Sequence, residues 1–166
     1  MDLPKRKSIR LTDFDYSANG YYFITICTAN KQKILCSIVG CGALDAPKTI
    51  LTQQGKIVEK YIKSSNNIPQ ITVCKYVIMP NHIHILLKLD NSGINGTSKA
   101  PSPTNKAIPH FVSTLKRFVN RDCEKNIFQR SFYDHIIRDE NDYLKIWNYI
   151  DTNPHKWAED KYYVKD

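Results

Sequence analysis

One segment near the middle of the chain, residues 79–89, restricts the fold most, because two histidines alternate there with large apolar residues. Successive side chains of a strand point to opposite faces. One face would carry Ile83, Ile85, Leu87 and Leu89, and the other His82, His84, Leu86 and Lys88. The first set predicts a core face, so the imidazoles should stand side by side on an open face, where the fold tolerates their replacement. Such a pair suits the binding of a ligand, although two hydrogen-bonded histidines on a half-exposed strand would show the same spacing.

The remaining periodic segments predict a single α+β domain spanning residues 1–166. We expect strands over 21–28, 71–79, 82–89 and 132–137, and helices over 52–65, from about 108 to 121, and over 139–153. This order, β-α-β-β-α-β followed by an extra C-terminal helix, matches a ferredoxin-like split βαβ core with an antiparallel sheet. In that topology the histidine strand is central and the helices cover one face of the sheet. The segment 90–106, rich in Gly, Ser, Asn and Pro, predicts a flexible loop.

The charge balance indicates an anionic partner. The chain has 24 Lys and Arg residues against 16 Asp and Glu residues, a formal charge of +8, which favours nucleic acid. We expect no membrane-spanning or secretory segment, since no apolar run is long enough. The five cysteines are scattered and odd in number, which predicts reduced thiols in a cytoplasmic protein and argues against a zinc ribbon or a disulfide framework.

The last predicted helix carries a second set of functional candidates. Tyr143, Ile146, Trp147 and Ile150 form its apolar stripe. Tyr149 lies off the centre of that stripe, and Asn153, one turn later, lies on nearly the same flank. A hydroxyl and an amide should therefore leave the helix side by side. Asn153 also suits a helix end before Pro154, and this structural role would explain its presence without any binding of a ligand.

Three motifs together resemble a known family. They are Pro-Asn-His-Ile-His at 80–84, Ser-Phe-Tyr-Asp-His-Ile-Ile-Arg at 131–138 and Asn-Tyr-Ile-Asp-Thr-Asn-Pro at 148–154. In this order they resemble the REP-associated tyrosine transposases, within the HUH superfamily of single-strand DNA transposases. The segments 8–16 and 20–28 are also similar to that group. A lone His-x-His is a weak signal, and its combination with Tyr-x-x-x-Asn-Pro in a terminal helix is much more specific.

The resemblance implies a function and a set of roles. His82, His84 and Asn153 would be ligands of Mg²⁺ or Mn²⁺, and Tyr149 would be the nucleophile. The reaction would be nicking and strand transfer of single-stranded or hairpin DNA, such as repeat-type palindromes, through a covalent 5′-phosphotyrosine. The protein would be a monomer or homodimer of the bacterial cytoplasm, associated with the nucleoid through DNA.

Other residues have open roles at this point. Tyr133 is the rival nucleophile, and His135 is either a partner that orients a metal ligand or an ordinary polar residue. The candidate phosphate contacts are Arg10, Lys116, Arg117, Arg121 and Arg138. Two other functions fit the same residues: a nucleic-acid-binding module without catalysis, and a metal-dependent nuclease that uses water and leaves Tyr149 idle.

Overall fold

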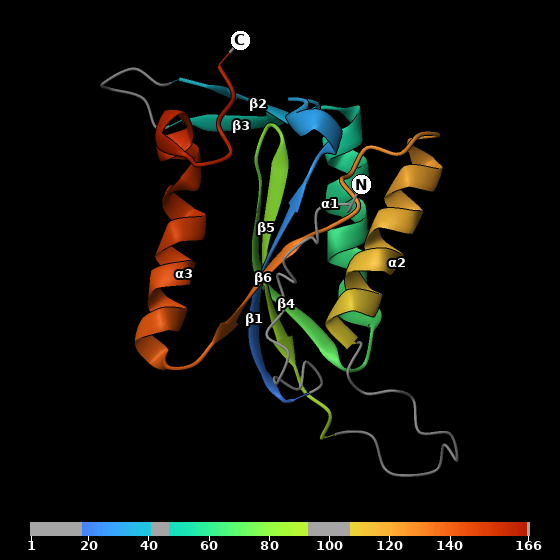
Figure 1. Ribbon diagram of the computed structural model, residues 1–166, viewed down its shortest axis with the longest axis vertical. Helices are drawn as coiled ribbons and strands as arrows, with labels where there is room; N and C mark the ends of the chain where they lie inside the picture. Colours follow the sequence, from blue (N-terminus) through green and yellow to red (C-terminus); the bar gives the residue numbers. More distant parts are fainter. Residues whose placement is uncertain (1–17, 41–46, 93–106, 166) are drawn as a thin grey trace, which may run out of the picture.

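A four-stranded antiparallel sheet lies at the centre of the molecule (Figure 1). The computed structural model describes residues 18–40, 47–92 and 107–165. The strands of this sheet are β1 (Gly20–Cys27), β4 (Ile71–Ile78), β5 (His82–Leu89) and β6 (Tyr133–Ile137). Their spatial order is β4-β5-β1-β6. This is the order of a ferredoxin-like split βαβ core, and the histidine strand β5 is central, as predicted.

The predicted helices are present, and the first and last begin at their predicted caps. They are α1 (Gln53–Ser64), α2 (Ala107–Asp122) and α3 (Glu140–Thr152). The side chain of Thr52 accepts a hydrogen bond from Gly55 N at 3.1 Å, and that of Asp139 accepts one from Asp142 N at 2.8 Å. These caps satisfy amides that have no partner within the helix, which is why the helices begin there. None of the described helices combines the length and apolar composition needed to cross a bilayer.

A short hairpin inserted between β1 and α1 was not predicted. Its strands are β2 (Cys36–Val39) and β3 (Lys48–Leu51). Each has only four residues, too few to show a convincing alternation. Short 3₁₀ segments complete the description: η1 (Ala29–Lys31), η2 (Ser65–Asn67) and η4 (Asn153–Glu159). Arg10 and most of the predicted 90–106 loop lie outside the described residues.

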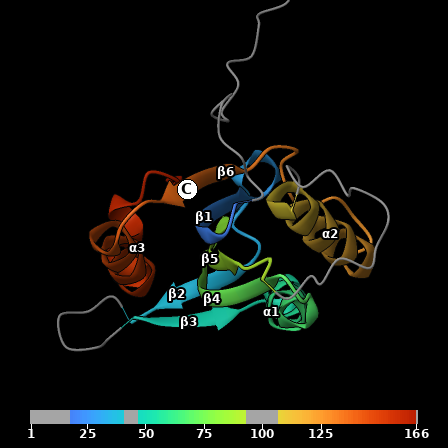
Figure 2. The same ribbon diagram turned by 90° about the horizontal axis from the view of Figure 1, so that it is seen from below.

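One face of the sheet forms the main core. Figure 2 shows α1 and α2 together on this side of the sheet. The four apolar residues that alternate along β5, Ile83, Ile85, Leu87 and Leu89, are fully buried here. The predicted assignment of faces along this strand is therefore confirmed.

The opposite face was expected to be free, and this expectation is wrong. Figure 2 shows α3 on this second side of the sheet. Phe23, Leu86 and Ile150 form a second, smaller core there. Lys75 fastens the helix, because its Nζ lies 2.7 Å from Asp151 Oδ1 and 3.9 Å from the centre of the Trp147 ring. Phe23 and Leu86 make this face partly apolar, so the apolar stripe of α3 can bury area against it.

As a result, His82 and His84 do not lie on an open surface. Both have 0% of their surface exposed, beneath α3 and the chain that follows it. Truncating both to Ala would leave a cavity, and cavities in a packed interior lower stability. The expectation that the fold tolerates their replacement is therefore wrong for Ala.

Gly55→Ala is expected to destabilise the protein. A Cβ at position 55 would lie 2.0 Å from the carbonyl oxygen of Leu35. That oxygen already accepts hydrogen bonds from Thr52 N and Oγ1, so it is not free to move. Helix propensity favours Ala by about 1 kcal/mol, but overpacking costs up to about 3 kcal/mol. A contact this short with the backbone belongs at the upper end, for a net loss of about 2 kcal/mol. Chemical denaturation measures the difference.

Gly20→Ala is the matched control, because the nearest atom to its added Cβ is 4.0 Å away in a side chain. The close-approach explanation of Gly55 is refuted if both variants unfold at the same denaturant concentration.

Candidate active site

The two histidines of β5 converge through their Nε2 atoms, which lie 3.0 Å apart. Each ring is oriented by a buried neighbour on its other side. His82 Nδ1 is 2.8 Å from Asn81 Oδ1, and His84 Nδ1 is 2.8 Å from Thr25 Oγ1. Such outer hydrogen bonds fix the tautomer and the ring direction of metal-binding histidines.

The tautomer of His82 follows from the bonding of Asn81. The Asn81 amide nitrogen donates to the main-chain carbonyl of Tyr162 at 2.8 Å, so its oxygen is left as an acceptor. His82 Nδ1 must therefore carry the hydrogen, and Nε2 of the neutral ring has a free lone pair. Asn81 is completely buried. Its place in the Pro-Asn-His-Ile-His motif thus has a structural reason: it aims the first histidine.

Burial keeps both imidazoles uncharged. It lowers the pKa of His82 to about 4, with smaller contributions from nearby charged groups. Burial, reinforced by His82, also lowers the pKa of His84 well below its ordinary value. Desolvation disfavours the charged form of a base. Neutral imidazole is the form that binds metal ions.

Tyr149 of α3 points its hydroxyl at this pair. Its Oη lies 3.3 Å from His84 Nε2 and donates a hydrogen bond to Asp160 Oδ2 at 3.1 Å. Burial, together with the Asp160 carboxylate, raises the pKa of Tyr149 above its ordinary value. The phenol is therefore protonated near pH 7, and it needs a base or a nearby cation to become a nucleophile.

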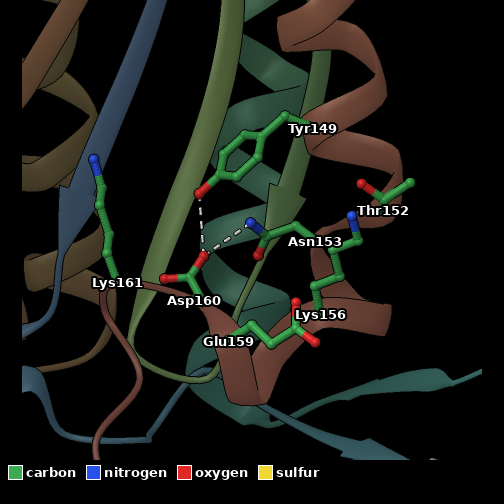
Figure 3. A pocket seen from close by; sticks show the side chains of 7 residues that line it. All are labelled: Tyr149, Thr152, Asn153, Lys156, Glu159, Asp160 and Lys161. Carbon is green, nitrogen blue, oxygen red and sulfur yellow. Dashed lines mark hydrogen bonds between the residues drawn. The ribbon is translucent and has the colours of Figure 1, made fainter.

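Asp160 joins the site from beyond α3 and was not among the predicted residues. Its Oδ2 accepts a hydrogen bond from Asn153 Nδ2 at 3.0 Å, and its Oδ1 accepts one from Tyr162 N at 2.6 Å. Figure 3 shows this carboxylate between the Tyr149 hydroxyl and the Asn153 amide. Ligand atoms of His82, His84 and Asp160 all lie within 4.8 Å of one another. No periodic pattern marks Asp160, because the 3₁₀ segment η4 carries it back after the helix ends.

The buried amide of Asn153 is only partly satisfied. Its nitrogen bonds Asp160, but its Oδ1 has no hydrogen-bond partner among the described residues, although the residue is only 3% exposed. A buried acceptor left without a partner costs about 1–3 kcal/mol. An oxygen in this situation, beside two imidazoles and a carboxylate, fits a divalent cation that accepts nitrogen and oxygen ligands. We refer to His82, His84, Asn153 and Asp160 as the ligand cluster.

A cavity of about 220 Å³ opens beside the ligand cluster. Figure 3 shows the side chains that line it, which include Tyr149, Asn153, Asp160, Lys156 and Lys161. The ring of Tyr162 also packs on the histidines, with its centre 4.7 Å from that of His82. The lining carries two lysines, Lys156 and Lys161, and two carboxylates, Glu159 and Asp160, so its formal charges balance.

The predicted basic residues differ in their hydrogen-bond partners. Lys116 Nζ donates to the main-chain carbonyls of Gln129, Arg130 and Ser131. It therefore holds the segment that leads into β6 against α2. Arg121 bonds Asp122 and the Tyr61 hydroxyl. With Arg117 they line a hollow of about 600 Å³ on the side of α2.

His135 and Arg138 lie on the other side of the sheet from α2, near the start of α3. His135 Nε2 lies 2.8 Å from Asp142 Oδ2, so the structure pairs it with this carboxylate. Arg138 lines a separate hollow with Tyr21 and Tyr143. The assignment of these residues to metal orientation and DNA contact stays a prediction.

The sequence has relatives along most of its length, although no model of a known family matches it. It is 32% identical to an uncharacterized protein of Haemophilus influenzae, over 96% of this chain and 93% of that protein. Two further relatives carry the name REP-associated tyrosine transposase. One, from Haemophilus influenzae, is 26% identical over 86% of this chain and 74% of its own length. The other, from Escherichia coli K12, is 24% identical over 86% of this chain and 72% of its own length.

A solved structure shares the fold. It is that of a REP-associated tyrosine transposase bound to a REP hairpin, with a TM-score of 0.58 and 21% sequence identity. The alignment covers 86% of this chain and 70% of that chain. The sequence relatives and the shared fold agree with the motifs at 80–84, 131–138 and 148–154. The chain is thus homologous to proteins named REP-associated tyrosine transposase and shares the fold of a solved one.

Proposed function

We propose that this protein nicks and rejoins single-stranded or hairpin DNA through a covalent bond to Tyr149. The observation that carries the proposal is the position of the Tyr149 hydroxyl, 3.3 Å from His84 Nε2 and 3.1 Å from Asp160 Oδ2. A nucleophilic oxygen at the edge of a ligand cluster is the arrangement that phosphodiester cleavage by a tyrosine requires. One chain supplies all of these groups.

The ligand cluster would hold Mg²⁺ or Mn²⁺. Neutral His82 offers its Nε2 lone pair, and His84 would offer its own once the hydrogen shared between the two Nε2 atoms moves to His84 Nδ1, beside Thr25 Oγ1. Asp160 offers a carboxylate and Asn153 offers its unpaired oxygen. Two imidazoles favour Mn²⁺ over Mg²⁺, which prefers oxygen ligands and its own waters. When bound, the cation would offset the negative charge that develops on the phosphate oxygens.

The residues divide the chemical step between them. Tyr149 Oη attacks the phosphorus and forms a new P–O bond, while its proton passes to Asp160 Oδ2, the carboxylate to which it already donates. The bond to the 3′ oxygen of the neighbouring nucleotide breaks, and that oxygen takes up a proton and leaves as a 3′ hydroxyl. The 5′-phosphotyrosine keeps the energy of the phosphodiester, so a 3′ hydroxyl of another strand can reverse the step without ATP.

The experiment that tests this proposal traps the covalent product. Wild-type protein is incubated with a labelled hairpin oligonucleotide that has single-stranded flanks, together with Mn²⁺, and is run on a denaturing gel. We expect a labelled band at the size of protein plus DNA fragment, which disappears with EDTA. Repeated turnover without any adduct would instead indicate hydrolysis by water, and binding without cleavage would indicate a DNA-binding module.

The form of the DNA should matter strongly. A phosphodiester inside a perfect duplex cannot reach an oxygen held between a helix and a sheet, so single-stranded or hairpin substrates should be cut in preference. Binding should weaken steeply with salt, because the excess of basic residues releases counterions from phosphates. Gel assays on a hairpin and on a blunt duplex of the same sequence, at two salt concentrations, measure both effects. Equal cleavage of the duplex would contradict the proposed substrate.

A further inference from the structure

A second cavity lies next to the candidate active site, between the edge strand β6 and helix α3. Its volume is about 370 Å³, and it is lined by Phe23, Tyr133, His135, Ile146, Tyr149 and Lys161. We call it the β6–α3 cavity. Tyr149 and Lys161 also line the cavity beside the ligand cluster. The two hollows therefore meet at the reactive phenol, and a DNA strand with a phosphate at Tyr149 has the β6–α3 cavity directly beside it.

The strand register places Tyr133 in line with the histidines. Tyr133 on β6 pairs with Thr25 on β1, and Thr25 pairs with His84 on β5. These three side chains share one face of the sheet. Tyr133 is thus about 10 Å from His84, two strand spacings away. Tyr133 is 41% exposed although it lines a cavity. An exposed flat ring at this distance lies within reach of the nucleotide that adjoins the attacked phosphate.

A cation accompanies the exposed ring. Lys161 Nζ lies 5.0 Å from the ring centre of Tyr133 and 4.9 Å from that of Tyr162. On the far side, His135 is held by its bond to Asp142, so this wall of the cavity is fixed. An aromatic platform beside a positive charge is the combination by which proteins bind single-stranded nucleic acid, with the base on the ring and the phosphate near the cation.

We propose that the β6–α3 cavity binds the base of the unpaired nucleotide next to the cleaved phosphodiester. Tyr133 is the stacking surface, and Lys161 contacts the adjoining phosphate. The motif at 131–138 then has a function that differs from catalysis: it holds the substrate beside Tyr149. This inference rests on the proposed function for the position of the phosphodiester, but the binding it describes does not require that any bond be broken.

Equilibrium binding without cleavage tests the inference. The probe is a fluorescein-labelled single-stranded 20-mer of mixed sequence, and anisotropy is measured in EDTA with the full chain. We expect Tyr133→Ala to bind about 5- to 150-fold more weakly, the loss of one base–aromatic stack. Tyr133→Phe keeps the ring and should bind like the wild type. Tyr163→Ala removes a comparably exposed tyrosine, at 37%, that does not line the cavity, and should also be unchanged.

A second measurement locates the base. The hairpin oligonucleotide is prepared with one abasic residue at each position of its flanks in turn. Wild-type protein should lose affinity most at one position, and Tyr133→Ala should no longer distinguish that position from the others. Lys161→Met should weaken binding and lower its salt dependence, because one phosphate contact is lost.

The outcomes separate this inference from the proposed function. If Tyr133→Ala binds like the wild type, or Tyr163→Ala and Tyr133→Phe lose as much as Tyr133→Ala, the cavity does not stack a base. Formation of the covalent adduct by the wild type in that case would leave the proposed function standing. Selective loss of binding in Tyr133→Ala supports the cavity as a base site even if no adduct is ever trapped. Unchanged melting temperatures would show that all variants are folded.

Discussion

Tyr149→Phe is expected to eliminate the covalent protein–DNA adduct and to reduce strand cleavage by several orders of magnitude. The substitution removes one oxygen, the atom that lies between His84 Nε2 and Asp160 Oδ2. The ring and its edge contact with Phe23 remain, so packing should change little. The lost hydrogen bond to Asp160 should alter stability by about 1 kcal/mol. Denaturing gels measure adduct formation, fluorescence anisotropy measures DNA binding, and thermal unfolding measures stability.

Tyr133→Phe is the matched control for this experiment. The rival tyrosine also stands on the histidine face of the sheet, but its ring lies under Lys161 at the entrance of the β6–α3 cavity. Tyr133→Phe should keep the adduct. If Tyr149→Phe still forms a 5′-phosphotyrosine and mass spectrometry finds it at Tyr133, the site is wrong while the class of reaction stands. If neither tyrosine is ever modified during turnover, the proposed function fails.

His84→Gln is expected to lower the affinity for Mn²⁺ by more than about 100-fold, because even the loss of an outer hydrogen bond to a ligand costs 10–100-fold. Gln is preferred to Ala because His84 is completely buried, between Thr25, Phe23 and Tyr149. Truncation there would combine a cavity with the loss of a ligand. Calorimetric titration with Mn²⁺ measures the affinity, and circular dichroism confirms the fold.

His110→Gln is the matched control, since this histidine is exposed on α2 and lies outside the ligand cluster. It should bind Mn²⁺ like the wild type. Asn81→Ala should give an intermediate loss, because it removes the acceptor that orients His82 without removing a ligand. Unchanged Mn²⁺ binding in His84→Gln would contradict the assignment of the ligand cluster.

Patterns between residues close in sequence were sufficient to predict most of the fold. Thr52 and Asp139 start their helices because a side-chain oxygen three residues before an amide is a purely local interaction. The two faces of β5 follow from the period of a strand, which does not depend on the rest of the chain. The hairpin β2–β3 escaped prediction because four-residue strands carry too little periodic signal.

The residues that lie within one element of each other were also accessible from the sequence. His82 and His84 share a face because they are two residues apart on a strand, and Tyr149 and Asn153 share a flank because they are one turn apart on a helix. The structure brings these two pairs together through the docking of α3, as the resemblance to the family implied.

Tertiary structure alone decided how the site is closed and completed. Asp160 reaches the ligand cluster through a 3₁₀ segment whose path follows no period, so its bonds to Tyr149 and Asn153 have no signature in the sequence. The burial of the histidines likewise depends on α3 packing over a face that looked open. Periodicity specifies which side of an element a residue occupies. What lies against that side depends on contacts between residues distant in sequence, such as Lys75 with Asp151 and Asn81 with Tyr162.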